Sequence, residues 1–334
     1  MEEPPGNPKF GLLKCPFALR EQIVRNMEFM DAFHLSTLSK RSKQMVHKAK
    51  YQTVHITFGF EEDSREDHIE FGIKDFERLK ISFSDSNDTP ERDPNAIDGR
   101  KLAILIDGPS CDYRKKLSAH LLFIFHSDWT IIYIERNIKN LGDIFQWNFR
   151  KTFDYVRLSA VGVLHITPEA LKSILNSLES KKFELEFKMD DSIYKYRETL
   201  NNCDILNVRD SIHWLEIDNF LDRNPKMKIL ALQDLPGEQI NNLLKQWIHG
   251  KVVDMETWYL LRNYGYPDDV IFDGIVTMKT KLTEKQAFAI FVFWDAASTT
   301  VDIRRKVDGK LATVHINWTG CVVSMCNEQI LAGL

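Results

Sequence analysis

The sequence predicts an α/β protein with a small helical head, a body of repeated strand–helix units and a β-rich tail. Apolar side chains recur at helical spacing between residues 10 and 50. Short apolar strands return at nearly constant intervals from about residue 100, and the residues after Asp273 are rich in β-branched and aromatic side chains. This order of patterns favours a compact helical unit that precedes a larger sheet.

Length and composition limit the possible functions. The 334 residues allow two or three domains, and 43% apolar with 28% charged residues is typical of an ordinary globular protein. A net charge of −4 gives no general attraction to nucleic acid or membranes, and no apolar run is long enough to span a bilayer. Five scattered cysteines suit a reduced cytoplasmic or nuclear setting better than a disulfide framework.

The head is predicted to contain three helices. Three prolines make residues 1–9 a loose lead, which lacks the pattern of a secretory signal. Asp31 is expected to cap a second helix and Ser39 a third, whose Lys and Arg side chains predict a solvated face rather than a nucleic-acid site. A first helix is expected over about residues 17–28, because four apolar residues share one face: Leu19, Ile23, Val24 and Met27.

The head also carries an ordered set of short motifs. They are Leu12-Leu13, Cys15-Pro16, Ile23-Val24, Leu35-Ser36 and Leu38-Ser39-Lys40-Arg41. In this order they resemble the F-box, over roughly residues 8–50. The resemblance implies docking to a Skp-type adaptor and, through it, to a cullin–RING ubiquitin ligase. The adaptor contacts that it implies are Leu12, Leu13, Pro16, Phe17, Ile23, Val24, Met27, Leu35, Leu38 and Ser39.

The segment departs from the F-box pattern at Cys15, where the family usually has Leu. A buried Cys is a smaller hydrophobe, so the exchange weakens docking by about 1 kcal/mol without abolishing it. The alternative is that Leu12, Leu13, Phe17 and Leu35 pack on the rest of this chain and leave no apolar surface for a partner.

Seven short apolar strands recur in the body. Helices are expected between some of them, at residues 115–127, 167–180 and 236–250, with Thr167 as a cap and Gly250 as a left-handed helix end. Each strand ends in a pair of apolar residues, and the last residues of successive pairs are 23 to 28 positions apart, which is within the range of leucine-rich repeats. These last residues are Ile106, Ile134, Leu158, Leu185, Val208, Leu232 and Leu260.

The predicted fold is a three-helix F-box followed by an irregular leucine-rich-repeat-like α/β solenoid with a parallel sheet and a small antiparallel β cap. A doubly wound α/β domain is the alternative, although the sequence contains no glycine-rich phosphate loop at a strand-to-helix turn. The predicted division is residues 1–9 as the lead, 10–50 as the F-box helices, 51–272 as the repeat body and 273–334 as the β cap.

Residues from about 180 to 265 carry a second resemblance, to the F-box-associated type 2 region. The matching residues are Trp214-Leu215, Phe220-Leu221, Ile229–Leu232 and the segment from Asn241 to Gly250. The family has an aromatic residue where Leu243 stands. The resemblance implies a region that captures substrate, while the apolar helix face around Trp247 is expected to be core.

The tail and the residues before the repeats complete the prediction. IVTMKT, FAIFVFWD, TTVDIRRKV, KLATVHINW and CVVSMCN are typical of strands, and Asp308-Gly309 indicates a hairpin. An acidic stretch follows residue 60, and residues 84–99 are predicted to form an exposed loop before the repeats.

No motif for catalysis is present. The sequence lacks a nucleophile elbow, a His-Glu-x-x-His motif, a Walker loop and a Cys-x-x-Cys pair, so we predict no catalytic residue, metal site or cofactor. Cys321 and Cys326 would point to opposite faces of a strand and make a poor metal pair.

The leading hypothesis is therefore a substrate-recognition subunit of a cullin–RING ubiquitin ligase that holds an unknown protein target. The alternatives are a scaffold or decoy that uses the repeats without the ligase, and an enzyme with an unrecognised site. The expected capture surface is the exposed side of the strands, formed by Tyr133, Glu135, Arg157, Glu184, Glu186, Asn207, Arg209, Gln233 and Tyr259.

Overall fold

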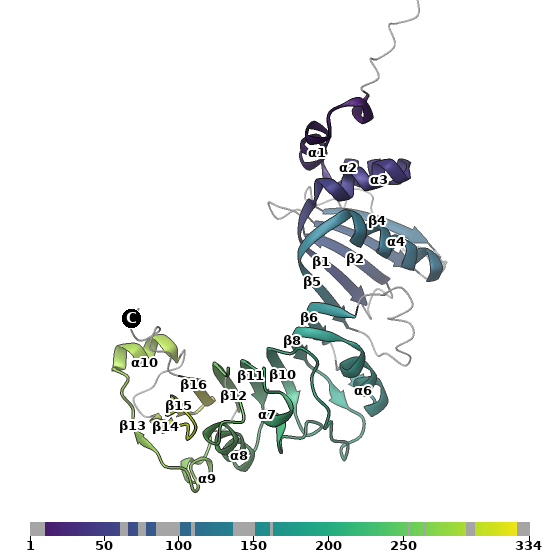
Figure 1. The fold of residues 1–334 in the computed structure, drawn as a ribbon. Helices are drawn as coiled ribbons and strands as arrows, with labels where there is room; N and C mark the ends of the chain where they lie inside the picture. Colours follow the sequence, from purple (N-terminus) through teal and green to yellow (C-terminus); the bar gives the residue numbers. More distant parts are fainter. Residues whose placement is uncertain are drawn as a thin grey trace, which may run out of the picture. The chain divides into compact units, whose positions relative to one another are not determined.

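The computed structural model describes residues 11–60, 66–72, 78–84, 101–107, 111–135, 151–160, 163–252, 254–262, 265–291 and 298–325. Contacts divide the chain into two compact units (Figure 1). The first unit contains residues 1–58, 66–130 and 145–149, and the second contains residues 59–65, 131–144 and 150–334. Strand β5 (Phe125–Ile134) contributes residues to both.

The first unit begins with the three predicted helices. A single 3-10 turn η1 (Leu12–Lys14) precedes α1 (Phe17–Arg25), α2 (Phe29–Leu38) and α3 (Lys40–Ala49). Ser39 caps α3 as predicted, because its hydroxyl oxygen accepts the Ser42 N–H at 3.1 Å. The prediction that Asp31 caps α2 is wrong. The helix starts earlier with Glu28 at its N-cap, which places Asp31 in the first turn, where its charge favours the positive helix end.

Part of the apolar surface of the head packs within the first unit. Phe29 is 5% exposed, and its ring stacks on Phe125 with centroids 4.2 Å apart. The ring of Phe71 lies 5.1 Å from Phe29, and that of Tyr51 lies 6.0 Å away. These contacts bury one face of α2 in an aromatic cluster, because aromatic rings remove large areas from water.

The strands of the first unit are β1 (Tyr51–Phe60), β2 (Glu66–Gly72), β3 (Arg78–Ser84) and β4 (Lys101–Asp107), with α4 (Cys111–Ile124) after them. Their order in the sheet is β5-β1-β2-β3-β4. The sequence prediction missed β2 and β3, which pair antiparallel. The predicted loop at residues 84–99 lies, apart from its first residue, outside the described residues.

The strand LAILID was wrongly placed at the start of the repeat series. It forms β4, which pairs parallel with β3, with Ile104 opposite Ile81, and it does not neighbour β5. Its spacing of 28 residues from the next apolar strand was therefore a coincidence, because spacing along the chain does not specify which strand is the neighbour.

The remaining six predicted strands lie side by side in the second unit. The end of β5 pairs parallel with β6 (Thr152–Leu158), and β8 (Glu179–Leu185), β10 (Ile205–Ser211), β11 (Ile229–Gln233) and β12 (Thr257–Leu261) continue the parallel series. The predicted apolar pairs of these strands are in register with one another. One continuous row across the strands consists of Ile132, Val156, Phe183, Leu206, Leu230 and Trp258, all completely buried.

Helices cover one side of these strands. Figure 1 shows α6 (Pro168–Ser177), α7 (Phe220–Arg223) and α8 (Gly237–Ile248) along that side, and α9 (Asp268–Ile271) follows β12. Thr167 caps α6, and Gly250 adopts φ +80° after α8, both as predicted. The predicted core face of α8 is confirmed, because Leu243, Leu244, Trp247 and Ile248 are buried. A two-stranded sheet of β7 (His165–Ile166) and β9 (Lys188–Met189) lies outside the main sheet.

The last strands make the sheet mixed. Strand β12 pairs antiparallel with β16 (Gly320–Met325), followed by β15 (Leu311–Asn317), β14 (Thr299–Arg304) and β13 (Met278–Lys279), all antiparallel. The hairpin at Asp308-Gly309 is closed by the Arg305 N–H, which donates to the Lys310 carbonyl at 2.8 Å. The body is thus a strand-rich α/β unit, and its mixed sheet does not establish a leucine-rich-repeat solenoid.

The first residues of the FAIFVFWD segment were wrongly predicted as part of a strand. They belong to α10 (Glu284–Ile290), which starts with a capping box between Thr283 and Gln286, and residues 292–297 lie outside the described residues. The local cap overrides the β propensity of the aromatic residues. Among the residues that the structure describes, no helix is long and apolar enough to cross a membrane.

Candidate functional site

The head keeps exposed apolar side chains after it has packed. Phe17 is 50% exposed, Leu19 is 47% exposed and Leu38 is 75% exposed. Two cations flank the Phe17 ring, with Cζ of Arg20 at 5.9 Å and Nζ of Lys48 at 5.6 Å from its centroid. The described head therefore presents apolar surface that its own chain does not cover.

The predicted adaptor contacts differ in their exposure. Pro16 and Ser39 are exposed, and four apolar side chains are partly exposed: Leu12, Ile23, Met27 and Leu35. Val24 is completely buried, so its predicted contact with a partner is wrong, and its side chain belongs to the core of the head. The side chain of Leu13 lies outside the described part of the structure.

Polar contacts join the head to α4. Oγ of Ser36 lies 2.7 Å from Nε2 of His120, and Nδ1 of His47 lies 2.6 Å from the Phe123 carbonyl oxygen. Burial, followed by the nearby positive charge of Lys43, lowers the pKa of His120, which keeps the imidazole neutral near pH 7. These contacts fix α2 and α3 on α4 within the first unit.

A second candidate surface lies in the second unit, on the face of the sheet opposite the buried apolar row. Residues paired across neighbouring strands form one line there: Tyr133, Arg157, Glu184, Asn207, Ala231 and Tyr259. Alternation along each strand places these side chains away from the core, as the sequence predicted. Five of these six residues were predicted capture residues, and Ala231 is the addition.

Glu184 is the centre of a polar cluster on this face. Its side chain accepts a hydrogen bond from the Tyr155 hydroxyl at 2.7 Å and lies 3.1 Å from Nη2 of Arg209. Nε of Arg157 and Nζ of Lys182 each lie 3.6 Å from its carboxylate. Glu184 is 3% exposed, so the prediction that it faces solvent is wrong. A buried carboxylate needs such partners, because an unpaired charge is costly away from water.

Two tyrosines complete this cluster. The rings of Tyr133 and Tyr155 meet edge to face with centroids 5.9 Å apart, and Nζ of Lys182 lies 4.4 Å from the centroid of the Tyr155 ring. Burial is the main cause of a raised pKa for Tyr155, and its hydrogen bond to Glu184 adds to the shift. Tyr155 therefore stays protonated and keeps donating to Glu184 over the ordinary pH range.

The sequence prediction missed Tyr155 and Lys182. Both stand two residues before a predicted position, Arg157 and Glu184, and strand alternation would have found them. The other predicted residues are not brought to Glu184. Gln233 and Tyr259 lie on β11 and β12, and Glu135 and Glu186 follow the last residues of β5 and β8.

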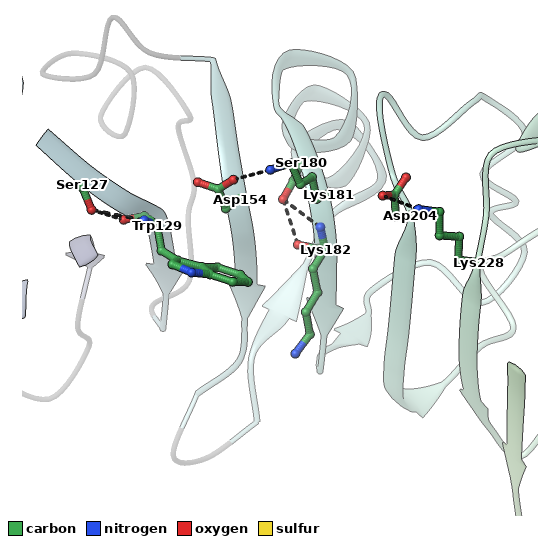
Figure 2. Close-up of polar contacts among 8 residues, drawn as sticks. All are labelled: Ser127, Trp129, Asp154, Ser180, Lys181, Lys182, Asp204 and Lys228. Carbon is green, nitrogen blue, oxygen red and sulfur yellow. Dashed lines mark hydrogen bonds and ion pairs between the residues drawn. The ribbon is translucent and has the colours of Figure 1, made fainter. Parts of the chain in front are cut away.

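Ion pairs mark the N-terminal ends of the same strands, as Figure 2 shows. Nζ of Lys181 lies 2.8 Å from Oδ1 of Asp154, and Nζ of Lys228 lies 3.6 Å from Oδ2 of Asp204. Ser180 fixes the backbone beside Lys182, because its hydroxyl donates to the Lys182 carbonyl at 2.8 Å. Figure 2 also draws Ser127 and Trp129 of β5, where the Ser127 hydroxyl donates to the Trp129 carbonyl at 2.6 Å.

Residues 12–51 match the family model of the F-box domain. This match supports the prediction that the chain is an F-box protein. It covers η1, α1, α2, α3 and the first residue of β1, so all ten predicted adaptor contacts lie within the matched segment. No curated protein and no solved structure matches the chain. The F-box is thus located on the helices whose exposed apolar side chains are described above, and the resemblance to an F-box-associated type 2 region stays a prediction.

The described residues also contain no group of three or more His, Cys, Asp or Glu side chains placed to hold a metal ion.

Proposed function

We propose that this chain is the substrate-recognition subunit of a cullin–RING, SCF-type ubiquitin ligase. The F-box match at residues 12–51, on helices that expose Phe17, Leu19 and Leu38, is the observation that carries the proposal. These side chains are suited to a helical groove of a Skp-type adaptor, because apolar helix side chains bind such grooves. The cytoplasm and the nucleus are the expected settings.

The second unit is the proposed receptor for a protein target. Its open sheet face offers Tyr133, Arg157, Arg209 and Tyr259, and the proposed F-box-associated type 2 region, at about residues 180–265, contributes β8, β10, β11 and β12 to it. The proposed role is proximity, because a target held near a ubiquitin-charged enzyme experiences a high effective concentration of that enzyme. The subunit itself then needs no catalytic residue, metal or cofactor.

Binding to a purified Skp-type adaptor tests the proposal. We expect the full chain to bind, and the double variant Leu13→Asp with Pro16→Ala to lose binding. Phe288→Ala is the control, since Phe288 is 68% exposed on α10, in the other unit. Failure of the unaltered chain to bind would overturn the ligase proposal.

That failure would favour the scaffold or decoy function. Cys15 is the observation behind this second candidate, because it supplies less apolar area than the usual Leu at an adaptor contact and its side chain is partly exposed.

A further inference from the structure

The cluster around Glu184 has an unequal balance of charge. Arg157, Lys182 and Arg209 surround one carboxylate at 3.6, 3.6 and 3.1 Å. Among the described residues, Glu184 is the only carboxylate within 4 Å of these three cations, so this group of four side chains carries a net charge of +2. The side chains of Arg157, Lys182 and Arg209 are 34%, 35% and 50% exposed, while that of Glu184 is 4% exposed. The cations therefore face solvent above the buried carboxylate.

The buried carboxylate holds these cations in place before any partner arrives. Glu184 is fixed by Tyr155, and Nε of Arg157 also donates to Oγ of Ser159 at 2.9 Å. An arginine has five N–H donors in a rigid planar group, so these contacts leave further donors for a ligand. Side chains that are already ordered lose less entropy on binding, which favours this cluster as a binding site.

The carboxylates around the cluster indicate where an anion is favourable. Glu135 and Glu186 lie toward the C-terminal ends of the strands, and an anion is disfavoured there. The favourable position is therefore on the N-terminal side of these two carboxylates, over Arg157 and Lys182.

Apolar side chains border this position on one side. Ile205 of β10 pairs with Lys182 in register, and Ile229 of β11 pairs with Ile205. Both isoleucines belong to the open face and are partly exposed. A ligand on this face thus meets two positive charges with an apolar strip next to them, which is complementary to a protein segment and not to a small inorganic anion.

We propose that this face binds a protein segment in which acidic side chains stand next to apolar ones. The acidic groups lie on Arg157 and Lys182, and an apolar side chain lies on Ile205 and Ile229. This inference rests on the proposed function, because it names the class of substrate that the receptor face accepts. The proposed anion is the carboxylate of Glu or Asp, which forms charge-assisted hydrogen bonds with Arg and Lys.

A labelled peptide of alternating Glu and Leu tests the inference on the full chain, with fluorescence anisotropy as the readout. We expect it to bind, the same peptide with Gln for Glu to bind much more weakly, and the peptide with Lys for Glu not to bind. The double variant Arg157→Gln with Lys182→Gln should weaken binding of the Glu peptide about tenfold. Higher salt should weaken it too, since these groups are partly exposed. A peptide with phosphoserine for Glu should bind no more tightly than the Glu peptide, and much tighter binding would overturn the choice of carboxylate as the anion.

The matched control is Arg197→Gln with Lys172→Gln. It removes one Arg and one Lys that pair with Glu216 and Glu198, and neither residue belongs to a strand of the main sheet. Equal binding of the Glu and Gln peptides, or an equal loss in the control variant, would overturn the inference. Circular dichroism checks that both variants fold, and the adaptor assay separates the two proposals. A chain that binds the adaptor but not the Glu peptide refutes only the inference, whereas the reverse result refutes only the ligase proposal.

Discussion

Replacement of Phe17 by Ala tests the size of the proposed adaptor contact. A Phe side chain has roughly 200 Å² of surface, and Phe17 is 50% exposed, so an adaptor that covers it removes about 100 Å² of apolar surface from water. At about 25 cal/mol per Å², this contributes about 2.5 kcal/mol to binding. Phe17→Ala should therefore raise the dissociation constant for a Skp-type adaptor roughly seventyfold.

Isothermal titration calorimetry with purified adaptor measures this change. Phe288→Ala is the matched control, because Phe288 is 68% exposed in the other unit and should leave the affinity unaltered. The buried half of Phe17 also supports the head, so the thermal midpoint of each variant must be measured. An affinity of Phe17→Ala within about twofold of the unaltered chain would refute the assignment of Phe17 to the adaptor surface.

Two further predictions concern stability. The Asp308 pKa lies at about 2, below its ordinary 3.8, mainly because Arg305 hydrogen-bonds to the carboxylate. The stabilisation from the ionised Asp308 carboxylate is complete above about pH 4 and is lost as the pH falls through 2. The thermal midpoint of Asp308→Asn should therefore fall less steeply in acid than that of the unaltered chain. The same pH dependence in both proteins would contradict this prediction. Gly250→Ala should cost about 1–2 kcal/mol in urea unfolding, because φ is +80° and a Cβ would lie 2.7 Å from Cγ2 of Val307. Gly309 also has a positive φ, +73°, but no atom lies within 4 Å of an added Cβ, so Gly309→Ala should lower the free energy of unfolding by less. Equal losses for the two variants would show that the contact with Val307 does not cause the larger cost at Gly250.

Features that depend on neighbouring residues were predictable from the sequence. The caps at Ser39 and Thr167 were predicted, because a cap joins a side chain to backbone three residues away. The apolar pairs ending at Ile134 and Leu158 were placed in register, because parallel strands bury the same face. The F-box helices were recognised from ordered motifs, and the match at residues 12–51 agrees with them.

The location of the open sheet face was also predictable, but its chemistry was not. Strand alternation put Arg157, Glu184 and Arg209 on one side. Whether Glu184 would be exposed or buried depended on its cationic partners, two of which, Arg157 and Arg209, are brought to it by the pairing of β6, β8 and β10. Lys182 comes from the strand of Glu184 itself, two residues before it, so strand alternation places it on the same face.

The sequence alone determined the helical head, its F-box and the register of six parallel strands, since these follow from periodicity and local capping. Tertiary structure decided that LAILID lies beside β3, that FAI is helical and that Glu184 is buried among cations. The physical reason is that strand order and the partners of a buried charge are set by residues far away in the chain, and apolar spacing does not encode them.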